Sequence, residues 1–135
     1  MACSNCGTAT ISFAVPEEYR TDAPSAASVV SFCPHCLTLE PATGEATQTS
    51  EGDPEFTRVS DGFPTQPARA VPLALAIGLC SSLATNRTAI ELLLREVERA
   101  GTDPLLVLDR LVADPSVDPA IDLERRRHQL EQLLY

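Results

Sequence analysis

The sequence predicts an α+β protein: a small N-terminal β module followed by a C-terminal all-α bundle of about four short helices. Two Cys-x-x-Cys pairs enclose the first part of the chain, and apolar residues alternate with period 2 between them. Helical periodicity with cap residues marks the C-terminal half. We therefore expect a metal-binding β module over residues 1–40, a linker over 41–67 and a helical domain over 68–135.

The four paired cysteines are the candidate metal ligands: Cys3 with Cys6, and Cys33 with Cys36. A two-residue spacer lets both sulfur atoms of a pair face one ion, and Gly7 can adopt the positive φ of the turn that follows. Four thiolates form a tetrahedral site that suits zinc, with iron as the less common occupant. Because such a site has no open position for water or substrate, we expect one structural zinc ion.

Each Cys-x-x-Cys pair, with the turn that it makes, is called a hook below. Residues 1–40 follow the order hook, strand, turn, strand, hook, which is the layout of a zinc ribbon. Ile11, Phe13 and Val15 alternate with small or polar residues and predict a half-buried strand. Further strands are expected over about 27–32 and 37–39. A module this small, in a chain with 4% aromatic residues, cannot bury a self-sufficient core. The metal should therefore contribute much of its folding free energy.

The segment 41–67 is expected to be a flexible linker that docks in part. Its first half is rich in Pro, Thr, Glu, Gly and Ser and has no hydrophobic period. Phe56, Val59 and Phe63 are large apolar exceptions, so the second half should pack against one of the two domains.

Four helices are expected in the last part of the chain. The first, over about 68–84, is apolar nearly all round and should be central and covered on several sides. The second follows Thr85, with Asn86 or the box Thr88-x-x-Glu91 as its cap, and stops at Gly101. The third and fourth open at Asp-Pro pairs, Asp103-Pro104 and Asp118-Pro119.

Three further side chains are candidates for chemistry, but each has a structural explanation. Cys80 lies on an apolar helical stripe and should be a buried, inert thiol. His35 lies between two cysteines that already supply ligands, so we expect a solvent-facing spacer. His128, among charged residues, should be exposed.

Residues 125–127 are three consecutive arginines, the only basic run in the sequence. We expect a solvated helix surface with i, i+4 ion pairs from Asp122 to Arg126 and from Arg127 to Glu131. The alternative is a docking patch for an acidic partner or for nucleic acid.

The chain of 135 residues has a net charge of −9, and all its basic residues are arginine. This composition resembles proteins of salt-accumulating halophiles, although a GC-rich genome gives a similar bias. The N-terminus has no secretory pattern, and the apolar stretch over 71–80 is too short to span a bilayer, so we expect a cytoplasmic protein without a membrane segment. In a reducing compartment, Cys-x-x-Cys pairs indicate metal ligands before disulfides.

The hooks Cys3-x2-Cys6-Gly7 and Cys33-Pro34-His35-Cys36 resemble those of small CPxCG-type zinc-ribbon proteins of haloarchaea. The whole chain, through its tail motifs over 103–111 and 122–127, is similar to an uncharacterised haloarchaeal family that joins such a ribbon to a helical tail. This resemblance implies zinc and the domain layout, and no activity. The hooks also resemble those of rubredoxins, which carry iron, but Leu37 replaces the second glycine and the shielding aromatic core has no counterpart.

We expect no enzyme, because the sequence has no phosphate loop and no recognisable catalytic constellation. The first functional hypothesis is an adaptor or regulatory protein that binds another protein. The second is a transcription-associated or nucleic-acid-binding ribbon, but Arg20 is the only basic residue in the first 40, so direct contact with nucleic acid is not expected. The third is a redox or iron electron-transfer protein. No small-molecule substrate is indicated.

Overall fold

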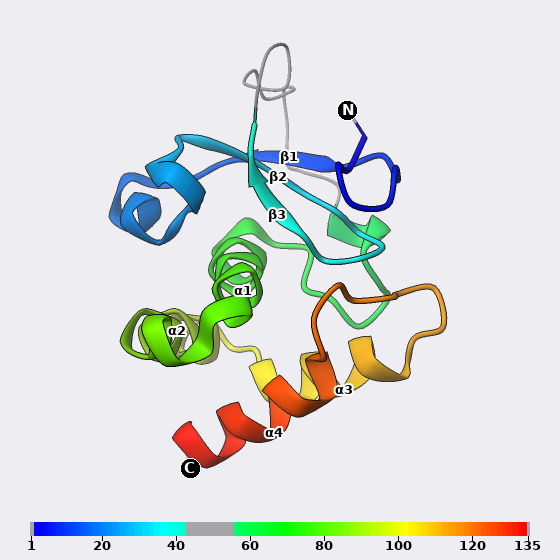
Figure 1. Cartoon of the computed structure of the whole chain (residues 1–135). Helices are drawn as coiled ribbons and strands as arrows, with labels where there is room; N and C mark the ends of the chain where they lie inside the picture. Colours follow the sequence, from blue (N-terminus) through cyan, green and yellow to red (C-terminus); the bar gives the residue numbers. More distant parts are fainter. Residues whose placement is uncertain (1, 43–55, 135) are drawn as a thin grey trace.

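The computed structural model describes residues 2–42 and 56–134, which form a small antiparallel sheet followed by helices (Figure 1). The sheet has the order β1-β2-β3, with strands β1 (Ile11–Ala14), β2 (Val29–Phe32) and β3 (Leu39–Pro41). The helices are α1 (Pro67–Leu79), α2 (Leu83–Arg99), α3 (Pro104–Ala113) and α4 (Leu123–Leu134). Short 3-10 segments are η1 (Glu17–Asp22), η2 (Pro24–Ala26), η4 (Phe56–Arg58) and η5 (Cys80–Ser82). The expected α+β fold is confirmed, whereas most of the expected flexible linker, residues 43–55, lies outside the described residues.

The first strand is the one that the alternation predicts. Ile11 pairs with Phe32 and Phe13 with Val30, and all four side chains are buried. The expected start of the second strand at residue 27 is wrong, because η2 occupies residues 24–26 and pairing begins two residues after Ala27. The third strand begins only at Leu39, because Leu37 has a φ of 61°, which an extended strand excludes.

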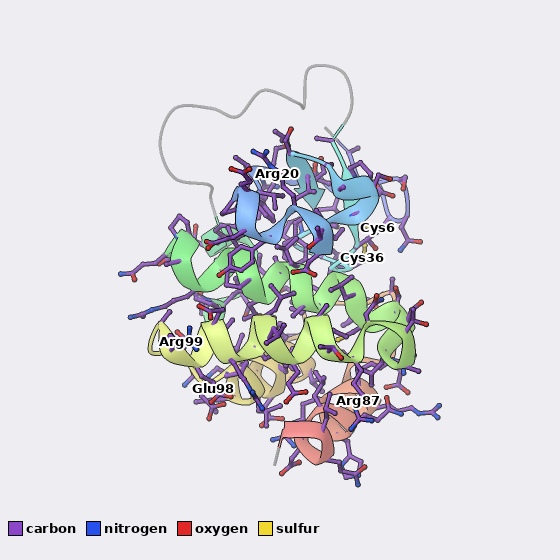
Figure 2. The ribbon with its side chains drawn as sticks, turned by 90° about the vertical axis from the view of Figure 1, so that its left-hand side faces the viewer. Cys6, Arg20, Cys36, Arg87, Glu98 and Arg99 are labelled. Carbon is purple, nitrogen blue, oxygen red and sulfur yellow. The ribbon has the colours of Figure 1, made fainter. Side chains whose placement is uncertain are left out.

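Residues of the sheet and of the helices belong to one hydrophobic core. In Figure 1 the sheet lies on one side of α1 and the other helices lie on the opposite side, and Figure 2 shows the same layers after a quarter turn. All residues of α1 from Ala70 to Ile77 are buried. The expectation of a central helix covered on several sides is confirmed, and the β module therefore packs directly on the helical part.

The segment that precedes α1 also belongs to this core, as its apolar residues predict. Phe56, Val59 and Phe63 are at most 3% exposed. The ring of Phe56 lies 5.4 Å from that of Phe13 in β1. Arg58 donates from Nη2 to the carbonyl oxygen of Ala9 at 2.6 Å. These contacts tie the segment to the sheet and to the first cysteine hook.

α1 and α2 form a tight hairpin around η5. The helical run Pro67–Arg99 is long and apolar enough, by length and composition, to cross a membrane. It is not one straight rod, however, because Arg69 at its start donates from Nε to the carbonyl oxygen of Ala100 just beyond its end, at 2.8 Å. Half of its most apolar stretch is buried inside the protein. The run is thus the core hairpin of this fold.

Three expected helix boundaries are wrong. The first helix gives way to η5 at Cys80 instead of continuing to residue 84. α2 then begins at Leu83, so Asn86 lies inside the helix, and its side chain donates to the carbonyl oxygen of Leu79 at 3.2 Å instead of capping. α4 begins at Leu123 instead of Asp118, because the carboxylate of Asp122 accepts the backbone N–H of Arg125 at 3.1 Å.

The expected cap of the third helix is confirmed and gives a direct test. Asp103 Oδ1 accepts the backbone N–H groups of Leu105 at 3.1 Å and Leu106 at 3.3 Å. Asp103→Ala should lower the free energy of unfolding by about 1 kcal/mol, measured by urea denaturation. Asp103→Asn keeps an acceptor and should lower the free energy of unfolding by only a few tenths of a kcal/mol, roughly. If both variants lower the free energy of unfolding by the same amount, the side-chain cap contributes nothing to stability.

Gly78 in α1 lies close against Leu39 of the sheet. A Cβ added there would lie 2.8 Å from Cδ2 and 2.9 Å from Cβ of Leu39 in β3. In an open helix, Gly→Ala stabilises by about 1 kcal/mol. Here Gly78→Ala should instead destabilise by about 1–3 kcal/mol in urea denaturation, because the sheet must move away. Thr85→Ala on the exposed side of α2 is the control, expected within about 0.5 kcal/mol of wild type. Stabilisation by Gly78→Ala would contradict this packing.

Candidate metal centre

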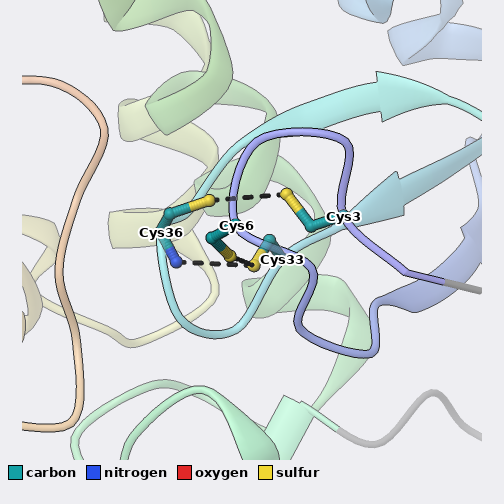
Figure 3. A group of neighbouring side chains, drawn as sticks. All are labelled: Cys3, Cys6, Cys33 and Cys36. Carbon is teal, nitrogen blue, oxygen red and sulfur yellow. Dashed lines mark hydrogen bonds between the residues drawn. The ribbon is translucent and has the colours of Figure 1, made fainter.

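The sulfur atoms of the four candidate cysteines, Cys3, Cys6, Cys33 and Cys36, lie within 4.8 Å of one another (Figure 3). The distance from Cys3 Sγ to Cys36 Sγ is 3.5 Å, and that from Cys6 Sγ to Cys33 Sγ is also 3.5 Å. These separations are far longer than a disulfide bond of about 2.0 Å. They are close to the edge of about 3.8 Å of a tetrahedron with metal–sulfur bonds of about 2.3 Å. The cluster could therefore hold a metal ion.

Two similar hooks build the cluster. In the first, Cys3 N donates to the carbonyl oxygen of Thr8 at 2.8 Å, and in the second, Cys33 N donates to that of Thr38 at 3.0 Å. Each hook turns on a residue with positive φ, Gly7 at 79° and Leu37 at 61°. A left-handed leucine costs about 1–2 kcal/mol, which burial of its side chain offsets. The missing glycine of the second hook therefore does not prevent the fold.

The first sulfur of each hook also accepts a backbone N–H. Asn5 N donates to Cys3 Sγ and Cys36 N donates to Cys33 Sγ, both at 3.4 Å. Hydrogen bonds from backbone amides stabilise a thiolate, which is the form that binds metal. The hooks are thus arranged for charged sulfur and not only for packing.

Two threonines complete the cluster and are absent from the candidates that the sequence supplies. Thr8 Oγ1 lies 3.3 Å from Cys6 Sγ, and Thr38 Oγ1 lies 3.0 Å from Cys36 Sγ. Both follow the second cysteine of a hook by two residues, and this repeated spacing, Cys-x-x-Cys-x-Thr, is a signal present in the sequence. A hydroxyl at this position can donate to a thiolate and support its negative charge.

The surroundings affect the four thiols differently. Burial raises the pKa of Cys33 to about 12 and raises that of Cys3. The hydroxyl of Thr8 lowers the pKa of the exposed Cys6. Burial alone would raise the pKa of Cys36, but hydrogen bonds, above all from Thr38, outweigh it and lower the pKa to about 6. The two threonines therefore favour thiolate on the second sulfur of each hook.

The loop between α3 and α4 holds the second hook from outside the sheet. Asp118 N donates to the carbonyl oxygen of His35 at 2.8 Å, and Ala120 N donates to that of Cys36 at 2.9 Å. His35 Nδ1 lies 2.9 Å from the carbonyl oxygen of Ser116. His35 does not belong to the cluster of four sulfur ligands, as expected of a spacer, but it is partly buried against this loop instead of facing solvent alone. Cys36 is thereby fixed between the sheet and the helical part.

The other candidate side chains lie apart from the cluster. Cys80 is 2% exposed, so the expected burial of its thiol is confirmed, and this burial raises the pKa of the thiol to about 11. His128 is exposed, as expected. Arg127 pairs with Glu131, as expected, and also with Asp109. The expected pair of Asp122 with Arg126 is not formed among the described residues, because the Asp122 carboxylate caps α4.

Fold and cluster together define a class: a small α+β protein in which two cysteine hooks form a four-thiol centre beside a helical core. The chain belongs to the family of unknown function DUF6276, whose model matches residues 2–134. A search of curated proteins returns no match to the chain, and neither does a search of solved structures.

Proposed function

We propose that this chain is a non-enzymatic cytoplasmic protein in which Cys3, Cys6, Cys33 and Cys36 hold one structural zinc ion in a zinc ribbon. The observation that carries the proposal is the convergence of four sulfur atoms within 4.8 Å. Four protein ligands occupy all four coordination positions of a tetrahedral ion, which then stabilises the fold without binding substrate. The resemblance of the hooks to haloarchaeal CPxCG-type ribbons supports zinc as the ion.

The ion would fix the N-terminal hook, the sheet and the helical part to one another. The first hook contacts the segment after the linker through Arg58, and the second contacts the α3–α4 loop through Ala120. Since both hooks would share one ion, the centre would connect all of these segments. Its role is then to stabilise the whole shared core and not the β module alone.

A cobalt-substituted protein tests the closed, structural character of the site. Cobalt(II) bound by four thiolates in tetrahedral geometry should give intense visible absorption with thiolate-to-metal bands in the near ultraviolet. Addition of imidazole or cyanide below the level that extracts the metal should leave this spectrum unchanged, because no position is open. A spectrum that shifts on addition would show an open position and contradict a purely structural role.

We propose further that the protein acts as an adaptor that binds another protein. Among the described residues, Leu92 at 58%, Leu106 at 47% and Val112 at 39% are large apolar side chains exposed on the helices, and contact with a partner would remove their surface from water. Because the sheet and helices share one core, the binding surface would belong to one rigid body and not to two tethered modules.

Purification of the tagged protein at high salt tests the adaptor function. A partner protein should copurify in stoichiometric amount, and Leu92→Asp or Leu106→Asp should release it while the fold is kept. Thr85→Asp, an equally exposed change on α2, is the matched control and should retain the partner. Elution of the wild-type protein alone would count against the adaptor.

A further inference from the structure

A cavity of about 330 Å³ lies between α2 and α4, apart from the cysteine cluster. Its polar lining includes two arginines and two glutamines, Arg87, Arg126, Gln129 and Gln132, and its apolar lining includes Leu83 and Leu133. Figure 2 labels Arg87 where α2 lies beside α4. No carboxylate from the described part of the chain lines this cavity, although the protein carries a net charge of −9.

Arg126 is presented to the cavity because its expected partner is engaged elsewhere. The spacing of Asp122 and Arg126 suits an ion pair on a helix, but Asp122 accepts the backbone N–H of Arg125 instead. The half-buried Arg126 donates from Nη1 to Gln129 Oε1 at 3.0 Å. A guanidinium has five N–H donors, so most of those of Arg126 stay available.

Both arginines keep their positive charge unneutralised on this side of the molecule. Within residues 2–42 and 56–134, neither Arg87 nor Arg126 has a carboxylate partner. The charge of Arg126 also acts on the Cys80 thiol: burial raises the pKa of that thiol, and Arg126 opposes the rise. Cys80 begins η5, the turn of the α1–α2 hairpin.

We propose that this cavity binds a small aliphatic carboxylate. The carboxylate oxygens accept from the guanidinium groups of Arg87 and Arg126, because the fork of N–H donors matches a carboxylate in two parallel hydrogen bonds. The aliphatic part lies against Leu83 and Leu133, where it removes apolar surface from water. An inorganic anion would leave these two leucines uncovered. The lining does not include the metal centre, so the proposal does not depend on which ion the cysteines hold.

Titration of the intact, isotope-labelled protein with hexanoate, followed by NMR at constant ionic strength, tests the proposal. The methyl signals of Leu83 and Leu133 and the side-chain amide signals of Gln129 and Gln132 should shift and saturate, with a dissociation constant in the millimolar range. Arg126→Gln and Arg87→Gln should each weaken binding about tenfold or more, because each removes a charged hydrogen-bonding partner.

Arg125→Gln is the matched control, because it makes the same change of charge on the same helix but does not line this cavity. It should change the affinity by less than about twofold. Circular dichroism of each variant establishes that it is folded, and Arg87, being exposed, provides a variant that leaves the core intact. Shifts that do not saturate, or an equal loss of affinity in Arg125→Gln and Arg126→Gln, would overturn the proposal.

Discussion

Cys33→Ser should abolish stoichiometric metal binding and unfold the sheet. Structural zinc in small finger peptides contributes about 10–16 kcal/mol at neutral pH, whereas a whole domain is stable by about 5–15 kcal/mol. Cys33 is fully buried in the cluster, and the next residue back in the chain, Phe32, is fully buried in the core. The unfolding that follows loss of the ion should therefore extend to α1, which the sheet covers. Thermal unfolding by circular dichroism should show a large fall in midpoint or no cooperative transition.

The control for this variant is Cys80→Ala, which removes the one cysteine outside the cluster. It should keep one metal ion per chain and lose only the stability expected for a small buried side chain. If Cys33→Ser bound metal stoichiometrically, or unfolded at the wild-type temperature, the cluster would not be the metal site that stabilises the fold. A melt in which the sheet is lost but the helices keep their cooperative transition would contradict the connecting role of the ion.

Phe56→Ala should lower the free energy of unfolding by about 3–5 kcal/mol. The Phe56 side chain is fully buried, and its ring lies 5.4 Å from Phe13 and 5.9 Å from Phe63. Its removal leaves a cavity between the sheet and the segment before α1, because neither neighbouring ring can move without leaving its own contacts. The measurement is urea denaturation of the metal-loaded protein.

Thr57→Ala is the control beside it, since Thr57 is exposed in the same 3-10 segment. It should change stability by no more than about 0.5 kcal/mol. A loss below about 1 kcal/mol for Phe56→Ala would mean that the segment detaches readily and is not part of the core.

The sequence alone predicts the elements whose signals are local. The alternation of Ile11 and Phe13 gives β1, and the pair Asp103-Pro104 gives the start of α3. The start of α4 is missed because Asp118-Pro119 carries the same local signal as Asp103-Pro104. At Asp118, a long-range contact decides otherwise: its backbone N–H donates to His35, far away in the sequence. A cap motif reports what a segment can do locally, and tertiary hydrogen bonds select among the possibilities.

In the candidate site, too, the sequence predicts the features with local signals and misses those that depend on long-range contacts. The four cysteines can be identified from spacing alone, because two hooks with the right separation have few other uses in a reducing compartment. Thr8 and Thr38 could be found only by aligning the two hooks with each other. The contacts of the second hook with Ser116 and Ala120 in the α3–α4 loop carry no sequence signal at all, since neither of these residues belongs to a motif. The same is true of the shared core, which depends on how the sheet lies over α1.

The measurement that tests the central claim most directly is elemental analysis, by plasma mass spectrometry, of protein purified without added metal or chelator. The account predicts one zinc per chain, with the four cluster cysteines unreactive towards thiol reagents until the ion is removed. Iron in place of zinc, or metal-free protein whose cluster cysteines are oxidised to disulfides, would contradict the structural zinc centre and favour redox chemistry at these hooks.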